Sequence, residues 1–136
     1  MKMILGAVLI AALLAPACSD PVPNPTPTPV TPTITETFNG TLAPNATNSH
    51  PFVTQQVGGV AVTLTNVDPL ARLTIGIGSP STTTGLCIAG TTVPTVPGPM
   101  PQITGTTTIK GPYCIAVSDN GIITGSTQYT VTVLHS

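Results

Sequence analysis

From Thr33 onward, apolar and polar residues alternate with a period close to two, and turn residues interrupt the alternation at regular intervals. This pattern is typical of antiparallel strands with one buried and one solvated face. The clearest predicted strands are residues 60–67, 73–77, 113–117 and 129–133, and weaker ones are residues 34–38, 51–55, 86–89 and 102–109. No segment has the periodicity of a crossover helix. The pattern therefore predicts an all-β fold, a small antiparallel jelly-roll-like β-sandwich of about eight strands.

The N-terminus has the pattern of an export signal. Lys2 precedes an apolar run over residues 3–14, which is shorter than the roughly 20 residues that a membrane-spanning helix needs. Small residues follow, and Ala17 lies directly before Cys18, as signal peptidases require. We therefore expect residues 1–17 to be a signal peptide that is cleaved between Ala17 and Cys18.

The residues before Cys18 resemble a bacterial lipobox, in which the cysteine takes a diacylglycerol thioether. The sequence departs from that motif at Ala15, where leucine is usual, and at Pro16. The three cysteines favour lipidation of Cys18, because an odd number in an exported protein leaves one thiol without a disulfide partner. Lipidation implies a cell-envelope protein. Ser19 follows the cysteine, and its resemblance to known sorting signals implies the outer membrane in a diderm host. Ordinary cleavage, giving a secreted or periplasmic protein, remains the alternative.

A proline-rich stretch follows Cys18. Proline occupies every second position from Pro21 to Pro29, and Pro32 lies just beyond. Proline fixes φ and favours extended polyproline II geometry, so the stretch is predicted to be a semi-rigid spacer. We expect residues 18–33 to form the lipid-bearing cysteine and its tether, and residues 34–136 to form the β-sandwich domain.

Charged residues make up only 5% of the chain, against about a quarter in an average globular protein. Once Lys2 is removed with the signal, the cations are Arg72 and Lys110. Two cations are too few for a nucleic-acid surface or a polybasic membrane patch. We therefore expect no nucleic-acid partner, and membrane contact only through the Cys18 lipid.

Cys87 and Cys114 each lie between residues that are predicted to point inward, so alternation places both sulfurs on outward faces. If their strands are neighbours, a cross-strand disulfide follows, since an exported protein matures in an oxidising compartment. Two separate reduced thiols are the alternative.

Several short motifs spread over residues 36–135 carry a resemblance to a known family. They are Phe38-Asn39-Gly40-Thr41-Leu42, His50-Pro51-Phe52-Val53, Val60-Ala61-Val62-Thr63-Leu64, Gly111-Pro112-Tyr113-Cys114-Ile115-Ala116-Val117 and Tyr129-Thr130-Val131-Thr132-Val133. With these motifs the stretch resembles the bacterial pre-peptidase C-terminal (PPC-like) family of β-sandwich modules. The resemblance implies a non-catalytic module that aids secretion, adhesion or substrate contact. Residues 45–49 are neutral where that family often has acidic residues, so the resemblance does not extend to a calcium site.

Few side chains could support catalysis. The ionisable candidates are Glu36, His50, Asp68, Asp119 and His135. None belongs to a recognised motif for nucleophilic, zinc or phosphate chemistry, and the penultimate His135 is expected to fray. We therefore predict no catalytic residue, no metal site and no cofactor. The segment Asp119-Asn120-Gly121 is interpreted as a turn rather than a cation loop.

Residues 93–101 form the most distinctive predicted loop, with prolines at four positions. The loop is interpreted as a crossover that protects a sheet edge, and the alternative is a stiff contact surface. Taken with the absence of a catalytic motif, the sequence predicts a monomeric, non-enzymatic lipoprotein. Its sandwich would act as a binding or cell-envelope module for a protein or glycan partner of unknown identity. The alternative is a soluble secreted accessory or inhibitor protein.

Overall fold

The computed structural model describes residues 33–136, so the predicted signal peptide, Cys18 and most of the proline-rich tether lie outside the described residues. The described part contains eight strands and no helix. The strands are β1 (Ile34–Leu42), β2 (Thr47–Thr54), β3 (Gly58–Asp68), β4 (Leu73–Pro80), β5 (Cys87–Thr95), β6 (Ile103–Thr107), β7 (Gly111–Ser118) and β8 (Thr127–His135). Each predicted strand overlaps one of these. Within this range, no helix has the length and hydropathy to cross a membrane.

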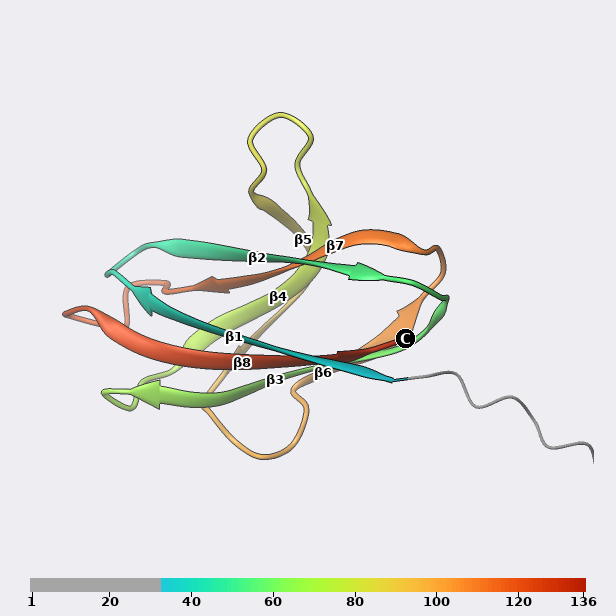
Figure 1. Cartoon of the computed structure of the whole chain (residues 1–136). Helices are drawn as coiled ribbons and strands as arrows, with labels where there is room; N and C mark the ends of the chain where they lie inside the picture. Colours follow the sequence, from blue (N-terminus) through green and yellow to red (C-terminus); the bar gives the residue numbers. More distant parts are fainter. Residues whose placement is uncertain (1–32) are drawn as a thin grey trace, which may run out of the picture.

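The strands form two antiparallel four-stranded sheets that pack face to face (Figure 1). One sheet has the order β1-β8-β3-β6 and the other has the order β2-β7-β4-β5. Every strand except β5 lies in the opposite sheet from the strand before it, which is the winding of an eight-stranded jelly roll. The predicted all-β, jelly-roll-like sandwich is therefore confirmed.

The core lies between the sheets and consists of the apolar positions of the alternating pattern. Val62 and Leu64 on β3, Ile75 on β4 and Val131 and Val133 on β8 have no exposed surface. Burying each such side chain contributes about 1.5–3 kcal/mol relative to leaving it exposed. The core therefore draws on both sheets, as expected when each sheet buries one face.

The two ends of the sandwich differ in what they carry. The chain enters β1 at Ile34, which pairs with His135 at the end of β8. We call this the tether end, and it also carries the β2–β3 and β6–β7 connections, whereas the β4–β5 connection stands away from the sandwich between the two ends (Figure 1). The β1–β2, β3–β4 and β7–β8 connections lie at the opposite end, which we call the distal end (Figure 1).

The proline loop covers part of the edge of β3. Strand β6 pairs with β3 only as far as Val62, and residues 96–102 continue along the edge. The Gly98 N–H donates to the Leu64 carbonyl at 2.9 Å, and the Gln102 side-chain oxygen accepts from the Leu64 N–H at 2.7 Å. These bonds satisfy backbone groups that an open edge would expose. They support the edge-protecting interpretation, although residues 93–95 of the predicted loop belong to β5.

Cys87 and Cys114 form a disulfide with their Cα atoms 5.5 Å apart. The predicted condition that their strands be neighbours is wrong, because β4 lies between β5 and β7. A register shift after Ile77 bends β5 over its neighbours, and the bend needs glycine at position 78, where a Cβ would overlap the Ile88 carbonyl oxygen. Cys114 is consequently only 1% exposed, so its sulfur lies under β5 and not on an open outward face.

Candidate binding site at the distal end

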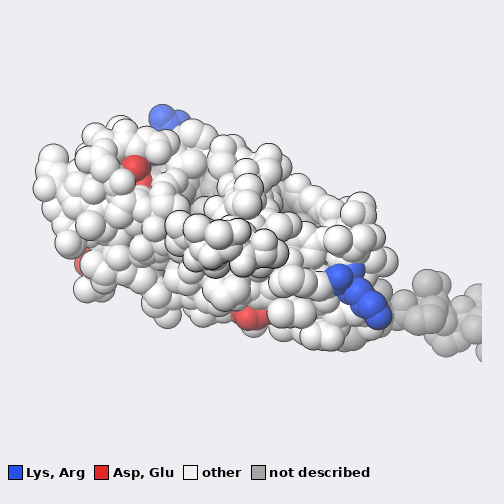
Figure 2. All heavy atoms as spheres, turned by 90° about the horizontal axis from the view of Figure 1, so that it is seen from above, with Lys and Arg blue, Asp and Glu red and all other residues white. Residues whose placement is uncertain are grey.

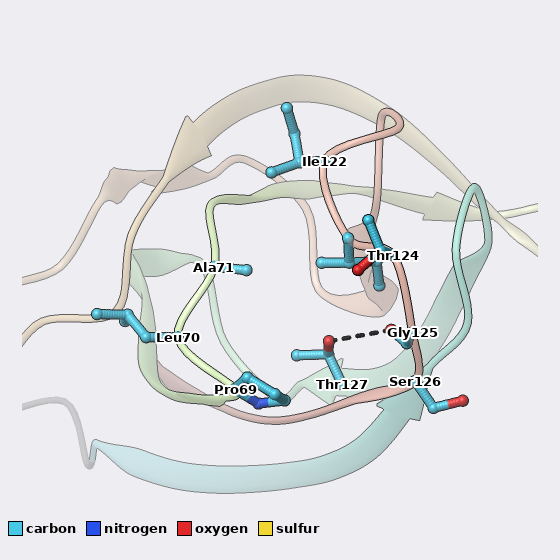
Figure 3. A pocket seen from close by; sticks show the side chains of 9 residues that line it. Pro69, Leu70, Ala71, Ile122, Thr124, Gly125, Ser126 and Thr127 are labelled. Carbon is cyan, nitrogen blue, oxygen red and sulfur yellow. Dashed lines mark hydrogen bonds between the residues drawn. The ribbon is translucent and has the colours of Figure 1, made fainter.

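Two connections at the distal end enclose a hollow of about 270 Å³ (Figure 3). Residues 69–71 between β3 and β4 form one side, and residues 122–127 between β7 and β8 form the other. The lining residues are Pro69, Leu70, Ala71, Ile122, Ile123, Thr124, Gly125, Ser126 and Thr127. Nothing among them is ionisable, so the hollow offers apolar contact and hydroxyl hydrogen bonds.

Apolar side chains contribute to both the floor and the rim of the hollow. Ile123 is buried in the core and Ala71 packs against it, with the Ala71 side chain pointing into the hollow (Figure 3). Leu70 and Ile122 on the rim are 77% and 58% exposed. Exposed aliphatic side chains beside an apolar floor mark a surface whose burial against a partner is favourable, because apolar area is removed from water.

Local backbone chemistry shapes both sides of the hollow. Proline has no N–H to donate to a ladder, so Pro69 ends β3, and the peptide bond that precedes it is cis. On the other side, the Thr127 hydroxyl donates to the Gly125 carbonyl at 3.3 Å, the contact dashed in Figure 3. The hollow therefore lies between a connection that begins with a proline and a connection that is held by a side-chain hydrogen bond.

Asp119 holds the β7–β8 connection in place. One carboxylate oxygen accepts the N–H groups of Ile122 at 2.8 Å and Ile123 at 3.1 Å. The other accepts the Asn45 N–H at 2.9 Å, from the turn between β1 and β2. The bond from Asn45 is the largest cause that lowers the pKa of Asp119, and the other backbone donors add to it. The arrangement supports the turn interpretation of residues 119–121, with Gly121 at a φ of 85°.

We expect Asp119→Asn to remove an acid-sensitive part of the stability. The pKa of Asp119 is lower in the folded chain than its ordinary value of about 3.8, so its contribution is complete above that value and is lost as the pH falls below it. Thermal unfolding from pH 6 to pH 2 should show a steeper loss in the wild type than in Asp119→Asn. Asp68→Asn, which removes an exposed carboxylate, controls for net charge. Equal slopes in wild type and Asp119→Asn would contradict this role.

The rings of the protein form two groups of three on β1, β2, β7 and β8. The chain has two Phe, two Tyr, two His and no Trp. Phe38, His50 and Tyr129 form one group, and Phe52, Tyr113 and His135 form the other. Phe38 stacks on His50 with ring centroids 5.0 Å apart, and Phe52 lies 5.0 Å from His135. Each group therefore combines rings from both sheets.

The expectation that His135 frays is wrong. Its side chain is fully buried, and its Nε2 lies 2.8 Å from a carboxylate oxygen of Glu36. Its Nδ1 lies 3.2 Å from the Ser136 carbonyl oxygen. Both ring nitrogens therefore face oxygen acceptors, and neither contacts a hydroxyl that the imidazole could activate. His135 continues the inward spacing of Val131 and Val133, which was the signal for its burial.

His50 makes a second polar contact, within the group of Phe38, His50 and Tyr129. Asn48 donates to the Tyr129 hydroxyl at 3.0 Å, and that hydroxyl lies 2.7 Å from the Nε2 of His50. Gly40 makes room for this hydroxyl, because a Cβ there would overlap it. Burial lowers the pKa of His50 and raises that of Tyr129, where the bond from Asn48 acts in the opposite direction. The neutral imidazole is therefore the form that the fold favours.

We expect acidification to destabilise the fold through His50. Because the folded pKa lies below the ordinary value of about 6.5, the unfolded chain binds more protons, and stability falls as the pH drops through and below 6.5. His50→Gln removes this titration and keeps hydrogen-bonding capacity toward Tyr129. Between pH 7.5 and pH 5, the melting temperature of the wild type should fall more than that of His50→Gln. Parallel curves would show that His50 does not contribute.

Comparison with known proteins does not assign the chain to a group. No family model matches it, and no curated protein matches it in sequence. The interpretation of the distal hollow therefore depends on its own geometry. Over residues 33–136, no three His, Cys, Asp or Glu side chains lie close enough together to hold a metal ion.

Charge is sparse over the described surface as a whole, although Asp68 and Arg72 flank the lining residues 69–71 and Asp119 contacts the lining residues 122 and 123. Seen from above, the surface shows isolated blue and red spots on an otherwise uncharged face (Figure 2). None of the candidate residues of the sequence lines the hollow. Glu36 contacts His135, and His50 contacts Tyr129. Asp119 lies beside the hollow and supports the β7–β8 connection, and Asp68 directly precedes the lining residue Pro69. The sequence analysis did not predict the hollow. Its only signal was the turn residues of the two connections, 69–71 and 122–127, which come together only in the folded chain.

Proposed function

We propose that this protein is a non-enzymatic binding module, held at the cell envelope by a lipid on Cys18, that presents its distal end to a partner. The observation that carries the proposal is the placement of two features at opposite ends. The described chain enters the sandwich at Ile34 at the tether end, and the apolar hollow lies at the distal end.

The composition of the hollow supports a binding role. Leu70 and Ile122 are exposed aliphatic side chains beside a buried apolar floor, and sites of this kind are typical of protein contact surfaces. With no ionisable group in its lining, the hollow has no acid or base for catalysis. A role in adhesion or substrate contact agrees with the resemblance to the PPC-like modules.

The proline-rich segment fits this role as a stalk. If Cys18 carries the lipid, the residues up to Pro32 separate the membrane surface from Ile34, and a polyproline II segment extends by about 3.1 Å per residue. An outer-membrane anchor would then leave the distal end facing away from the lipid. The departures at Ala15 and Pro16 from a lipobox favour the second candidate, a soluble secreted accessory or inhibitor protein.

Photo-cross-linking in cells tests the use of the distal end. A photoreactive amino acid at Ile122 is compared with the same amino acid at Ile109, which is 69% exposed but lies in the β6–β7 connection at the tether end. We expect discrete adducts from position 122 that are absent from position 109, and their loss when Leu70→Asp is added. Identical adduct patterns from both positions, or none from position 122, would contradict a distal binding site.

A further inference from the structure

A second surface at the distal end carries amide side chains in a regular arrangement. It lies on the outer face of the sheet β1-β8-β3, and we call it the amide face. Its residues are Asn39, Thr41, Asn66, Asp68, Gln128 and Thr130. The strand register places them in two rows: Asn39 and Asn66 flank Thr130, and Thr41 and Asp68 flank Gln128.

The amide face contains a hollow of about 430 Å³, a volume within the usual range of small-ligand sites. The lining residues are Asn39, Gly40, Thr41, Asn66, Gln128, Tyr129 and Thr130. The register of β3 against β8 shifts between Leu64 and Asn66. Such a bulge bends a strand and redirects its side chains.

The amides of this face retain hydrogen-bonding capacity. The Thr130 hydroxyl donates to the Asn39 side-chain oxygen at 2.8 Å, which leaves both N–H groups of the Asn39 amide without a partner in the described residues. The side chains of Asn66 and Gln128 make no hydrogen bond to another described residue. A primary amide donates through its nitrogen and accepts through its oxygen, as a sugar hydroxyl also does. The face is therefore complementary to a polyhydroxylated ligand.

The position of the amides distinguishes this face from an ordinary solvated sheet surface. The next rows toward the tether end carry Thr37, Thr132 and Thr63, and then Thr35, Leu134 and Ala61. Threonine favours strands, whereas asparagine is depleted in them. The asparagines therefore occupy strand positions that local propensity disfavours, and they do so only where the face is hollowed. Conflicts of this kind are expected at functional sites.

Charge selects the class of ligand. The cations of the described residues are Arg72 and Lys110, and neither belongs to the amide face. Its single ionisable side chain is the exposed carboxylate of Asp68, which pairs across the strands with Gln128. Asp68 makes no ion pair with either cation of the described residues, so its carboxylate disfavours phosphate, sulfate or uronic acid groups. We propose that the amide face binds a neutral glycan. This proposal rests on the proposed function only in that both make the domain a binding module.

A titration monitored by NMR tests the proposal on the full mature chain. The probes are maltohexaose, cellohexaose and tetra-N-acetylchitotetraose, with tetragalacturonate as the acidic counterpart. Side-chain NH₂ signals of Asn39, Asn66 and Gln128 report contact directly. We expect at least one neutral oligosaccharide to shift these signals in a saturable way, and tetragalacturonate to bind at least tenfold more weakly.

Two variants make the outcome specific. Asn39→Thr with Asn66→Thr places strand-compatible threonine where the neighbouring rows have it, and we expect at least tenfold weaker binding with an unchanged melting temperature. Gln56→Ala, an exposed amide in the β2–β3 connection, should leave binding unchanged. The proposal is overturned if no neutral probe shifts the amide face, if the acidic probe binds equally well, or if the double variant binds normally. Each result is independent of the cross-linking at Ile122, so the two proposals can fail separately.

Discussion

Reduction of the Cys87–Cys114 disulfide lowers the free energy of unfolding by about 3.6 kcal/mol in the chain-entropy model of cross-links. The value follows from the sequence separation of 27 between the two cysteines. The reduced unfolded chain has more conformations, and the bent start of β5 loses its attachment to β7. For a domain of roughly 100 residues, this loss corresponds to a fall in melting temperature of about 15 °C or more.

Denaturant unfolding with and without reductant measures the effect, and the variant Cys87→Ala/Cys114→Ala is the control. The variant should match the reduced wild type and should not respond to reductant. A wild type that is equally stable in both states would show that the bond does not constrain the unfolded chain.

The second large effect is expected from truncation of the core. Leu64 on β3 has no exposed surface, and its side chain lies between the two sheets. Leu64→Ala removes apolar contacts and leaves a cavity, so we expect a loss of about 3 kcal/mol in the free energy of unfolding.

Leu134→Ala is the matched control, because Leu134 lies on the outer face of the same sheet and is 43% exposed. The same chemical change there should alter stability by less than about 1 kcal/mol, since little apolar burial is lost. Denaturation midpoints of both variants at an unchanged slope give the comparison. Equal losses in the two variants would contradict the assignment of inner and outer faces.

Period-two alternation was sufficient to predict the strands and the class of fold. Val60, Val62 and Leu64 alternate with polar or small residues. That pattern determines which face of β3 is buried, whichever strands lie beside it. The same alternation places His135 in the core, whereas its position near the end of the chain predicts fraying. Its contact with Glu36, 99 residues away in the sequence, depends on β1 pairing with β8.

Features that depend on strand order could not be predicted from local pattern. The disulfide crosses β4 because β5 bends where it passes Gly78 of β4, and no neighbouring residue signals which strands will flank β4. The distal hollow likewise needs Leu70 and Ile122 to be brought together from connections 52 positions apart. The amide face combines residues from three strands, and its rows exist only in the register that the fold imposes.

The anchored display of the distal end is the central claim, and the mass of the mature protein tests it most directly. The protein is expressed with its own N-terminus in a diderm bacterium, extracted, and divided between detergent and aqueous phases before intact and peptide mass spectrometry. We predict a detergent-phase protein that begins at Cys18, carries a diacylglyceryl group on that residue, and contains the Cys87–Cys114 bond. An aqueous protein with an unmodified Cys18 would contradict the anchor and establish the soluble secreted alternative.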